Sequence, residues 1–146
     1  MMKEAPKEFE QHYAALGILS QEAEQWQQQI EAVDEQLAEL RLTSQSIKEL
    51  SGVREGTDIL VPVSKGIFVK AQVKDTHDLI VNVGAGIVLN KSPEETSKLL
   101  SGQLKEIAFI REQMVARLEE TSQKASILRQ HIKSASIGKK TVQNEG

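Results

Sequence analysis

The fold is decided by the stretch from Asp58 to Lys91, which reads DILVPVSKGIFVKAQVKDTHDLIVNVGAGIVLNK. Apolar residues alternate with other residues along it, which is the pattern of half-buried β-strands. Turn-forming residues interrupt the alternation at residues 64–66, 75–78 and 84–86. The stretch therefore predicts four short strands in two tandem β-hairpins, with Pro62 marking an edge or an interruption.

Two long segments with a heptad repeat flank this stretch, and each predicts a helix of roughly 65 Å. Spacings of three and four residues keep one stripe of a helix, its seam, facing a partner in a coiled coil. The first seam comprises Phe9, His12, Leu16, Leu19, Ala23, Trp26, Ile30, Val33, Leu37, Leu40, Ser44, Ile47 and Ser51. The second comprises Leu100, Leu104, Ile107, Arg111, Met114, Leu118, Thr121, Ala125, Leu128, Ile132 and Ala135. We expect the two helices to pair antiparallel within one chain.

Helix start and stop signals set the expected boundaries. Gly52 is expected to cap the first helix, and Gly138 to end the second. Ser92, Pro93 and Glu95 form the N-cap, first-turn proline and capping-box pattern of a helix start. The expected domains are the N-terminal coiled-coil helix at 1–51, the hairpins at 52–91, the C-terminal coiled-coil helix at 92–138 and a flexible tail at 139–146.

The composition narrows the class of protein. The chain has 146 residues, no cysteine, a net charge of −3 and only 3% aromatic residues. It therefore lacks a disulfide framework, a basic stripe for nucleic acid and the large rings of a thick single core. The first residues, MMKEAPKEFEQ, contain no signal-peptide core, and no segment is apolar enough to span a membrane. We expect a cytoplasmic protein that binds neither nucleic acid nor membranes.

Catalytic, nucleotide and metal sites are poorly supported. Gly84-Ala85-Gly86 lacks the third glycine and the following helix of a dinucleotide loop, so we interpret it as a hairpin turn. His12 and His131 could meet in an antiparallel coiled coil, but two imidazoles make a poor zinc site. We expect no enzyme activity, no metal and no cofactor.

The predicted sheet is too small to cover its own apolar residues, so we expect an obligate oligomer assembled through residues 57–90. The residues expected at the oligomer interface are Ile59, Val61, Val63, Ile67, Val69, Val73, Leu79, Val81, Val83, Ile87 and Leu89.

The same region resembles the α class of the prefoldin family, whose subunits place two β-hairpins between two long helices. The resemblance rests on residues 58–64 (DILVPVS), 66–69 (GIFV), 73–75 (VKD) and 81–86 (VNVGAG). Two positions depart from the family pattern: Ala71 stands where glycine is frequent, and Ile87 where an aromatic residue is frequent. The fold class is thus α+β, a long antiparallel two-helix coiled coil with two β-hairpins at its base that join an oligomeric β-barrel platform.

The resemblance implies an ATP-independent co-chaperone, or holdase. Its partners would be prefoldin β-class subunits, two α with four β in a hexamer, together with non-native polypeptides and a cytosolic group II chaperonin. The short termini look more like the archaeal form. Clients would be held at the coiled-coil tips.

Apolar residues near the expected tip are the candidate client-binding residues. They are Phe9, Tyr13, Leu16, Ile18, Leu19, Ile127, Leu128, Ile132 and Ile137. Tyr13, Ile18, Ile127 and Ile137 lie off the seam, where a two-helix coiled coil leaves them exposed. Other off-seam residues nearer the base, such as Leu42, Phe109 and Ile110, leave open that these are scattered surface residues. The alternative function is a structural coiled-coil scaffold or tether with a fixed folded partner.

Overall fold

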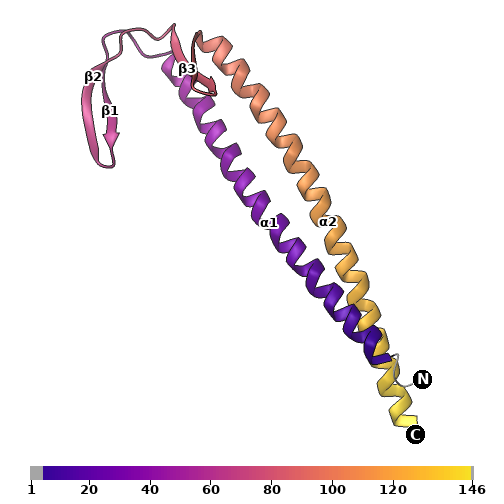
Figure 1. The fold of residues 1–146 in the computed structure, drawn as a ribbon. Helices are drawn as coiled ribbons and strands as arrows, with labels where there is room; N and C mark the ends of the chain where they lie inside the picture. Colours follow the sequence, from indigo (N-terminus) through magenta and orange to yellow (C-terminus); the bar gives the residue numbers. More distant parts are fainter. Residues whose placement is uncertain (1–4, 146) are drawn as a thin grey trace. The chain divides into compact units, whose positions relative to one another are not determined.

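The computed structural model describes the backbone of residues 5–145 and the side chains of residues 7–135. Helix α1 spans Ala5–Leu50 and helix α2 spans Pro93–Glu145, and the two helices run antiparallel with two β-hairpins between them in the chain (Figure 1). The expected arrangement of two long antiparallel helices with two β-hairpins between them is confirmed. The residues group into two compact units, one of residues 1–34 with 109–146 and the other of residues 35–108.

The first unit is a stretch of two-helix coiled coil. Every expected seam residue of α1 from Phe9 to Val33 is buried or half-buried, and so is every one of α2 from Arg111 to Ile132. Ile30, Val33, Ala125 and Ile132 are its most buried apolar residues. Only Ala135 of the expected seam is exposed in this unit. The burial follows the 3.5-residue period because a two-helix coiled coil shields only the facing stripe of each helix.

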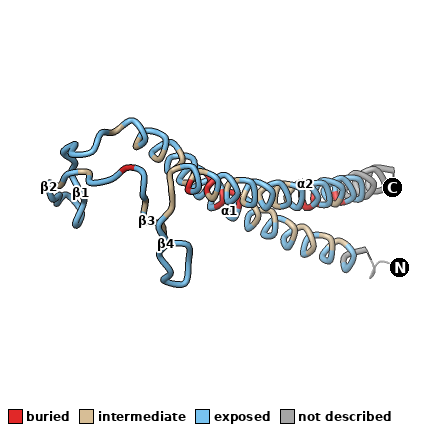
Figure 2. The backbone as a smooth tube through the Cα atoms, turned by 90° about the horizontal axis from the view of Figure 1, so that it is seen from above, coloured by how far each residue is buried: buried red, intermediate tan, exposed pale blue. Residues whose placement is uncertain are grey.

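The second unit contains the rest of both helices together with the hairpins. The expected seam residues from Leu37 to Ile47 and from Leu100 to Ile107 are buried or half-buried, as the tube in Figure 2 shows along each helix. Ser51 departs from the expectation and is exposed, because α1 ends one residue before it.

The start of α2 is capped as its sequence predicts. The Ser92 hydroxyl accepts a hydrogen bond from the Glu95 backbone N–H at 3.1 Å, and Pro93 is the first helical residue. The backbone N–H and the hydroxyl of Thr96 both donate to the Ser92 carbonyl, at 3.0 and 2.8 Å. The Ser92 hydroxyl thus satisfies a backbone N–H that a helix start otherwise leaves free, and the Thr96 N–H makes the first regular bond of the helix.

The C-terminal ends of the two helices, expected at Gly52 and Gly138, differ from the sequence prediction. Gly52 follows α1 but does not take the left-handed conformation of a glycine cap. Its N–H donates to the Glu49 carbonyl at 3.1 Å, and Val53 donates to Leu50 at 3.0 Å. Helix α2 extends to Glu145, beyond the boundary expected at Gly138, and one glycine costs a helix only about 1 kcal/mol relative to alanine. The flexible tail expected at 139–146 lies outside the residues whose side chains are described. The division of the chain into four domains stays a prediction.

The four expected strands are present as two separate antiparallel hairpins. Strand β1 (Asp58–Ser64) pairs with β2 (Ile67–Gln72), and β3 (Leu79–Gly84) pairs with β4 (Ile87–Lys91). Ala85 and Gly86 both have positive φ, at 52° and 74°, as a two-residue type I′ turn requires. Pro62 does not interrupt β1, because it pairs with Phe68 just before a register shift.

Candidate assembly and binding surfaces

The strand register gives the first hairpin one largely apolar face. Ile59 lies opposite Ala71, and Val61 lies opposite Val69. Val63 lies two residues after Val61, and Ile67 lies two residues before Val69, so strand alternation places both on this face. A register shift after Pro62 sets Ser64 opposite Ile67. Leu60, facing Lys70, lies on the opposite face, which mixes apolar and polar residues.

The second hairpin repeats this arrangement. Val81 lies opposite Leu89, and Leu79 lies two residues before Val81 on the same face. Val83 and Ile87 complete that face next to the turn. The residues expected at the oligomer interface thus lie on one face of each hairpin, except that Val73 follows the end of β2.

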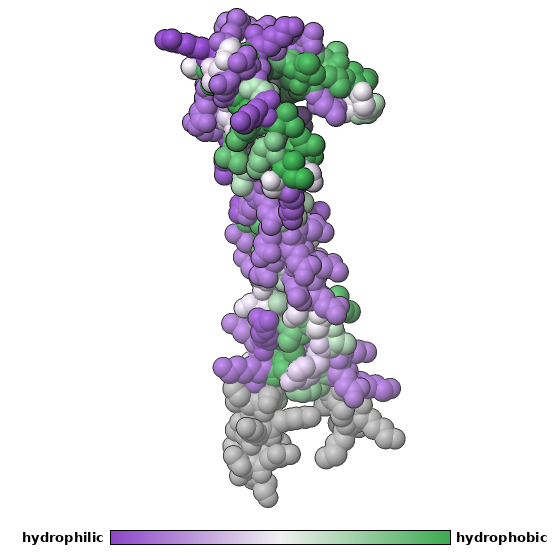
Figure 3. All heavy atoms as spheres, turned by 90° about the vertical axis from the view of Figure 1, so that its left-hand side faces the viewer, coloured by the Kyte–Doolittle hydropathy of each residue, from purple (hydrophilic) through white to green (hydrophobic). Residues whose placement is uncertain are grey.

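Both apolar faces are open to solvent. Of the expected interface residues only Val73, Leu79 and Val81 are half-buried, and the others are exposed. Figure 3 shows hydrophobic side chains gathered over the hairpins, in contrast to the mostly hydrophilic helices. A two-stranded sheet has no second layer to bury such a face, so each hairpin presents a surface that needs a partner.

Sequence reasoning missed further apolar residues on the hairpins. Leu60, Phe68, Ile80 and Val88 lie on the faces opposite those just described, and all four are exposed. The signal was present in the continuous apolar runs Ile59-Leu60-Val61 and Leu79-Ile80-Val81. Such runs are typical of strands covered on both faces rather than one.

The candidate client-binding residues fall into two sets in the first unit. Phe9, Leu16, Leu19, Leu128 and Ile132 belong to the seam and are half-buried or buried. Tyr13, Ile18 and Ile127 are exposed by 53%, 66% and 56%. The side chain of Ile137 lies outside the described residues. Of the eight candidates whose side chains are described, three are therefore broadly accessible, and the five seam residues pack between the helices.

The aromatic pair at the start of α1 joins the two sets. The rings of Phe9 and Tyr13 meet edge to face, with their centroids 4.9 Å apart. This contact orients an exposed ring against a half-buried one, and such pairs add about 0.5–1.5 kcal/mol beyond area burial.

An interhelical ion pair occupies the polar position in the second seam. Arg111 Nε donates to Asp34 Oδ1 at 2.5 Å, and the second guanidinium nitrogen, Nη2, lies 3.4 Å from Oδ2. The hydrogen bond and the charge of Asp34 raise the pKa of Arg111 above its usual value. This forked contact favours one register of the two helices, because it fixes one residue of α1 against one of α2. Asp34 was missed because it lies beside the seam rather than on it.

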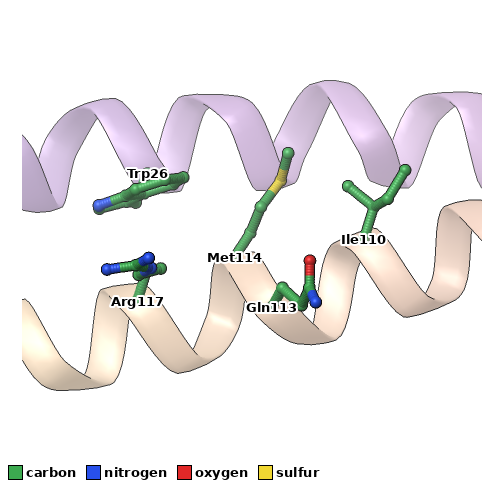
Figure 4. A pocket seen from close by; sticks show the side chains of 5 residues that line it. All are labelled: Trp26, Ile110, Gln113, Met114 and Arg117. Atoms are coloured by element: carbon green, nitrogen blue, oxygen red, sulfur yellow. The ribbon is translucent and has the colours of Figure 1, made fainter.

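A shallow pocket of about 220 Å³ opens between the helices of the first unit. It is lined by Trp26 of α1 and by Ile110, Gln113, Met114 and Arg117 of α2 (Figure 4). The Arg117 guanidinium lies beside the Trp26 ring, and the buried indole N–H finds no acceptor among the described residues. The pocket offers an apolar wall and the unpaired Trp26 N–H, but its lining residues include no nucleophile or general base.

The described residues show neither a metal-binding cluster nor a helix apolar enough to cross a membrane. No three His, Asp or Glu side chains within the described part of the chain gather to hold an ion. His12 is half-buried, whereas His77 and His131 are exposed.

These features together define a class of protein: an antiparallel two-helix coiled coil with two β-hairpins that expose apolar faces. The prefoldin subunit family model matches residues 19–138. Prefoldin subunit alpha of Thermofilum pendens is 29% identical over 111 residues, covering 71% of this chain and 86% of that protein. Prefoldin subunit alpha of Methanococcus aeolicus is 28% identical over 131 residues, covering 80% and 89%.

A solved structure agrees with these relatives. A cryo-EM structure of filamentous prefoldin from Methanocaldococcus jannaschii matches with a TM-score of 0.72 and 25% identity, covering 79% of this chain and 95% of that chain. The chain belongs to the prefoldin family, as an alpha-type subunit. It is therefore a non-enzymatic chaperone subunit with a co-chaperone role that assembles with other prefoldin subunits.

Proposed function

We propose that the chain is a holdase subunit that captures non-native proteins without ATP through exposed apolar side chains of its coiled coil. The observation that carries the proposal is the exposure of Tyr13, Ile18 and Ile127 outside the seam. Unfolded chains expose apolar segments of no fixed sequence, so accessible and adaptable side chains suit them better than a shaped pocket.

One such contact is too weak to hold a client by itself, so the coiled coils (arms) of several subunits must bind the client together. Burying one large apolar side chain contributes about 1.5–3 kcal/mol at most, and the ordering of client and side chains offsets much of it. Several arms on one platform raise the effective concentration of binding sites around a captured client. The proposed assembly is a hexamer of two alpha and four beta subunits, joined by the hairpins, that delivers clients to a group II chaperonin in the cytoplasm.

A second assembly state is supported by one comparison. The matching Methanocaldococcus jannaschii structure is of filamentous prefoldin, so a filament is the alternative to the hexamer. Mass measurement of the chain alone, and after co-expression with a prefoldin β-class subunit, separates the two.

The functional test uses aggregation of several unrelated denatured proteins, followed by light scattering without ATP. The triple variant Tyr13→Ser, Ile18→Ser, Ile127→Ser should protect clients less well and keep its helicity, because the seam is unchanged. The matched control is Leu42→Ser, which removes a side chain that is 69% exposed but outside the candidate set. A triple variant that protects as well as the unmodified chain would remove these residues from the client-binding surface.

The same assay separates the holdase from a structural scaffold or tether. A tether has one fixed folded partner and should protect none of the denatured proteins. Protection of several unrelated clients supports the holdase.

A further inference from the structure

The pocket between the two helices of the first unit combines an unused hydrogen-bond donor with an apolar wall. The indole N–H of Trp26 is buried and has no acceptor among the described residues. An unpaired buried donor costs stability, and native proteins keep few of them. An incoming acceptor would therefore gain a hydrogen bond that the chain itself does not supply.

Arg117 places a second donor at the same end of the pocket. Its guanidinium lies beside the nitrogen-bearing end of the Trp26 ring (Figure 4). Its ion pair with Glu120 is 4.0 Å long and its side chain is 67% exposed, so the guanidinium is held only weakly and can move aside. None of the residues that line the pocket is acidic. Two donors without a negative charge between them favour an occupant that brings a carbonyl oxygen.

The rest of the pocket suits an apolar side chain. Ile110 and Met114 form its wall, and the volume is about 220 Å³. A cavity of about 150 Å³ takes up a benzene molecule, so this pocket has room for one large apolar side chain. Methionine is unbranched and flexible, which lets a shallow pocket adapt to side chains of different shapes.

The pocket lies on the same side of the coiled coil as Ile127, one of the exposed candidate client-binding residues. Gln113, which lines the pocket, and Ile127 are two heptads apart on α2, and residues at heptad spacing share one side of the helix. Two heptads of helix span about 21 Å. An extended chain covers this distance in about six residues, so one client segment reaches both places.

We infer that the pocket is a second, inner binding position for non-native proteins. An extended client segment places one apolar side chain against Ile110 and Met114, and one of its main-chain carbonyls accepts the Trp26 N–H. Every polypeptide carries such carbonyls, so the contact does not depend on the sequence of the client. The pocket adds to the residues near the tip and does not replace them, because one contact is too weak to hold a client. This inference rests on the proposed holdase function.

Tryptophan fluorescence tests the inference on the unmodified chain, because Trp26 is its only tryptophan. The assembly is formed with β-class subunits that lack tryptophan. The probe is reduced and carbamidomethylated ribonuclease A, an unfolded chain without tryptophan. Trp26 is half-buried, and a bound segment should cover the rest of the ring and lower its acrylamide quenching constant at least about twofold.

Two outcomes of this measurement would overturn the inference. One is an unchanged quenching constant when the client is bound. The other is a constant that already falls when the subunits assemble, before client is added, since a neighbouring subunit would then occupy the pocket.

A matched pair of variants tests the apolar wall, with client binding measured by fluorescence anisotropy of a dye-labelled client. Ile110 lines the pocket and is 45% exposed, whereas the adjacent Phe109 is 58% exposed and is not among the lining residues. Ile110→Ser should weaken client binding by about fivefold, because the client can no longer cover this side chain. Phe109→Ser should change it less than about twofold. Equal effects of the two substitutions would show that the pocket is not a specific position.

The donor is tested by Trp26→Phe, which keeps an aromatic ring in the seam and removes the N–H. Client binding should weaken by about three- to tenfold, as expected for one lost hydrogen bond. Circular dichroism checks that the variant stays helical. Unchanged client binding by a helical Trp26→Phe assembly would overturn the assignment of the client carbonyl.

The outcomes separate the inner position from the holdase function itself. If the unmodified assembly protects clients while Trp26 quenching and the binding of Ile110→Ser stay unchanged, the inner position is wrong and the holdase function stands. If the unmodified assembly binds and protects no client, both are overturned.

Discussion

Replacing Val69 by aspartate places a charge in the middle of the apolar face of the β1–β2 hairpin. Val69 lies opposite Val61 and is 51% exposed in the single chain, so assembly has about half of this side chain left to bury. Full burial of a valine contributes about 1.5–3 kcal/mol, which makes the remaining half worth about 1 kcal/mol per copy. Val69→Ala should cost roughly that amount of assembly free energy.

The aspartate adds the larger penalty of desolvating a carboxylate, which is several kcal/mol in real proteins. A total of about 4 kcal/mol per copy corresponds to a roughly thousandfold weaker association. Sedimentation velocity over a concentration series measures the loss of the oligomer. Circular dichroism should show that the helices remain, because the seam is untouched.

Phe68→Asp is the matched control for this prediction. Phe68 is the preceding residue of the same strand, is 56% exposed and lies on the opposite face of the hairpin. It should disturb assembly less than Val69→Asp. A Val69→Asp protein that keeps its full size, or a Phe68→Asp protein that dissociates more readily, would refute the assignment of the assembly face.

Two further predictions concern the helices. Ser92→Ala removes the acceptor of the Glu95 N–H and should lower the free energy of unfolding by about 0.5–2 kcal/mol, measured by thermal denaturation; an unchanged stability would show that the cap is dispensable. Because the chain has no cysteine, Phe9→Cys with Ile132→Cys should form a disulfide within one chain, detected on a denaturing gel; a product linked only between chains would indicate intermolecular coiled coils.

The seam could be predicted residue by residue because its burial depends on a local period. Counting heptads along the sequence places each seam residue from Phe9 to Ile47, and each of these seam residues is buried or half-buried. The strands could be predicted equally well, since the alternation of apolar residues and the turn at Gly84–Gly86 are both local features of the sequence. The cap at Ser92 was predictable for the same reason.

Features that depend on how distant segments pair in three dimensions could not be predicted from the sequence. The partner of Arg111 required the relative register of the two helices, and several carboxylates near the seam would have served equally well. The conformation of Gly52 depends on how the chain leaves α1, which no local pattern specifies.

The central claim is that the free ends of the coiled coil hold non-native proteins while the hairpins hold the subunits together. The most direct measurement compares aggregation suppression by the full assembly with that of one lacking residues 1–18 and 128–146. The truncated protein should still reach full oligomeric mass, because residues 57–90 are intact, and should no longer keep denatured clients soluble. Protection equal to that of the full assembly would contradict the claim and move the client-binding surface to the hairpins or to Phe109 and Ile110.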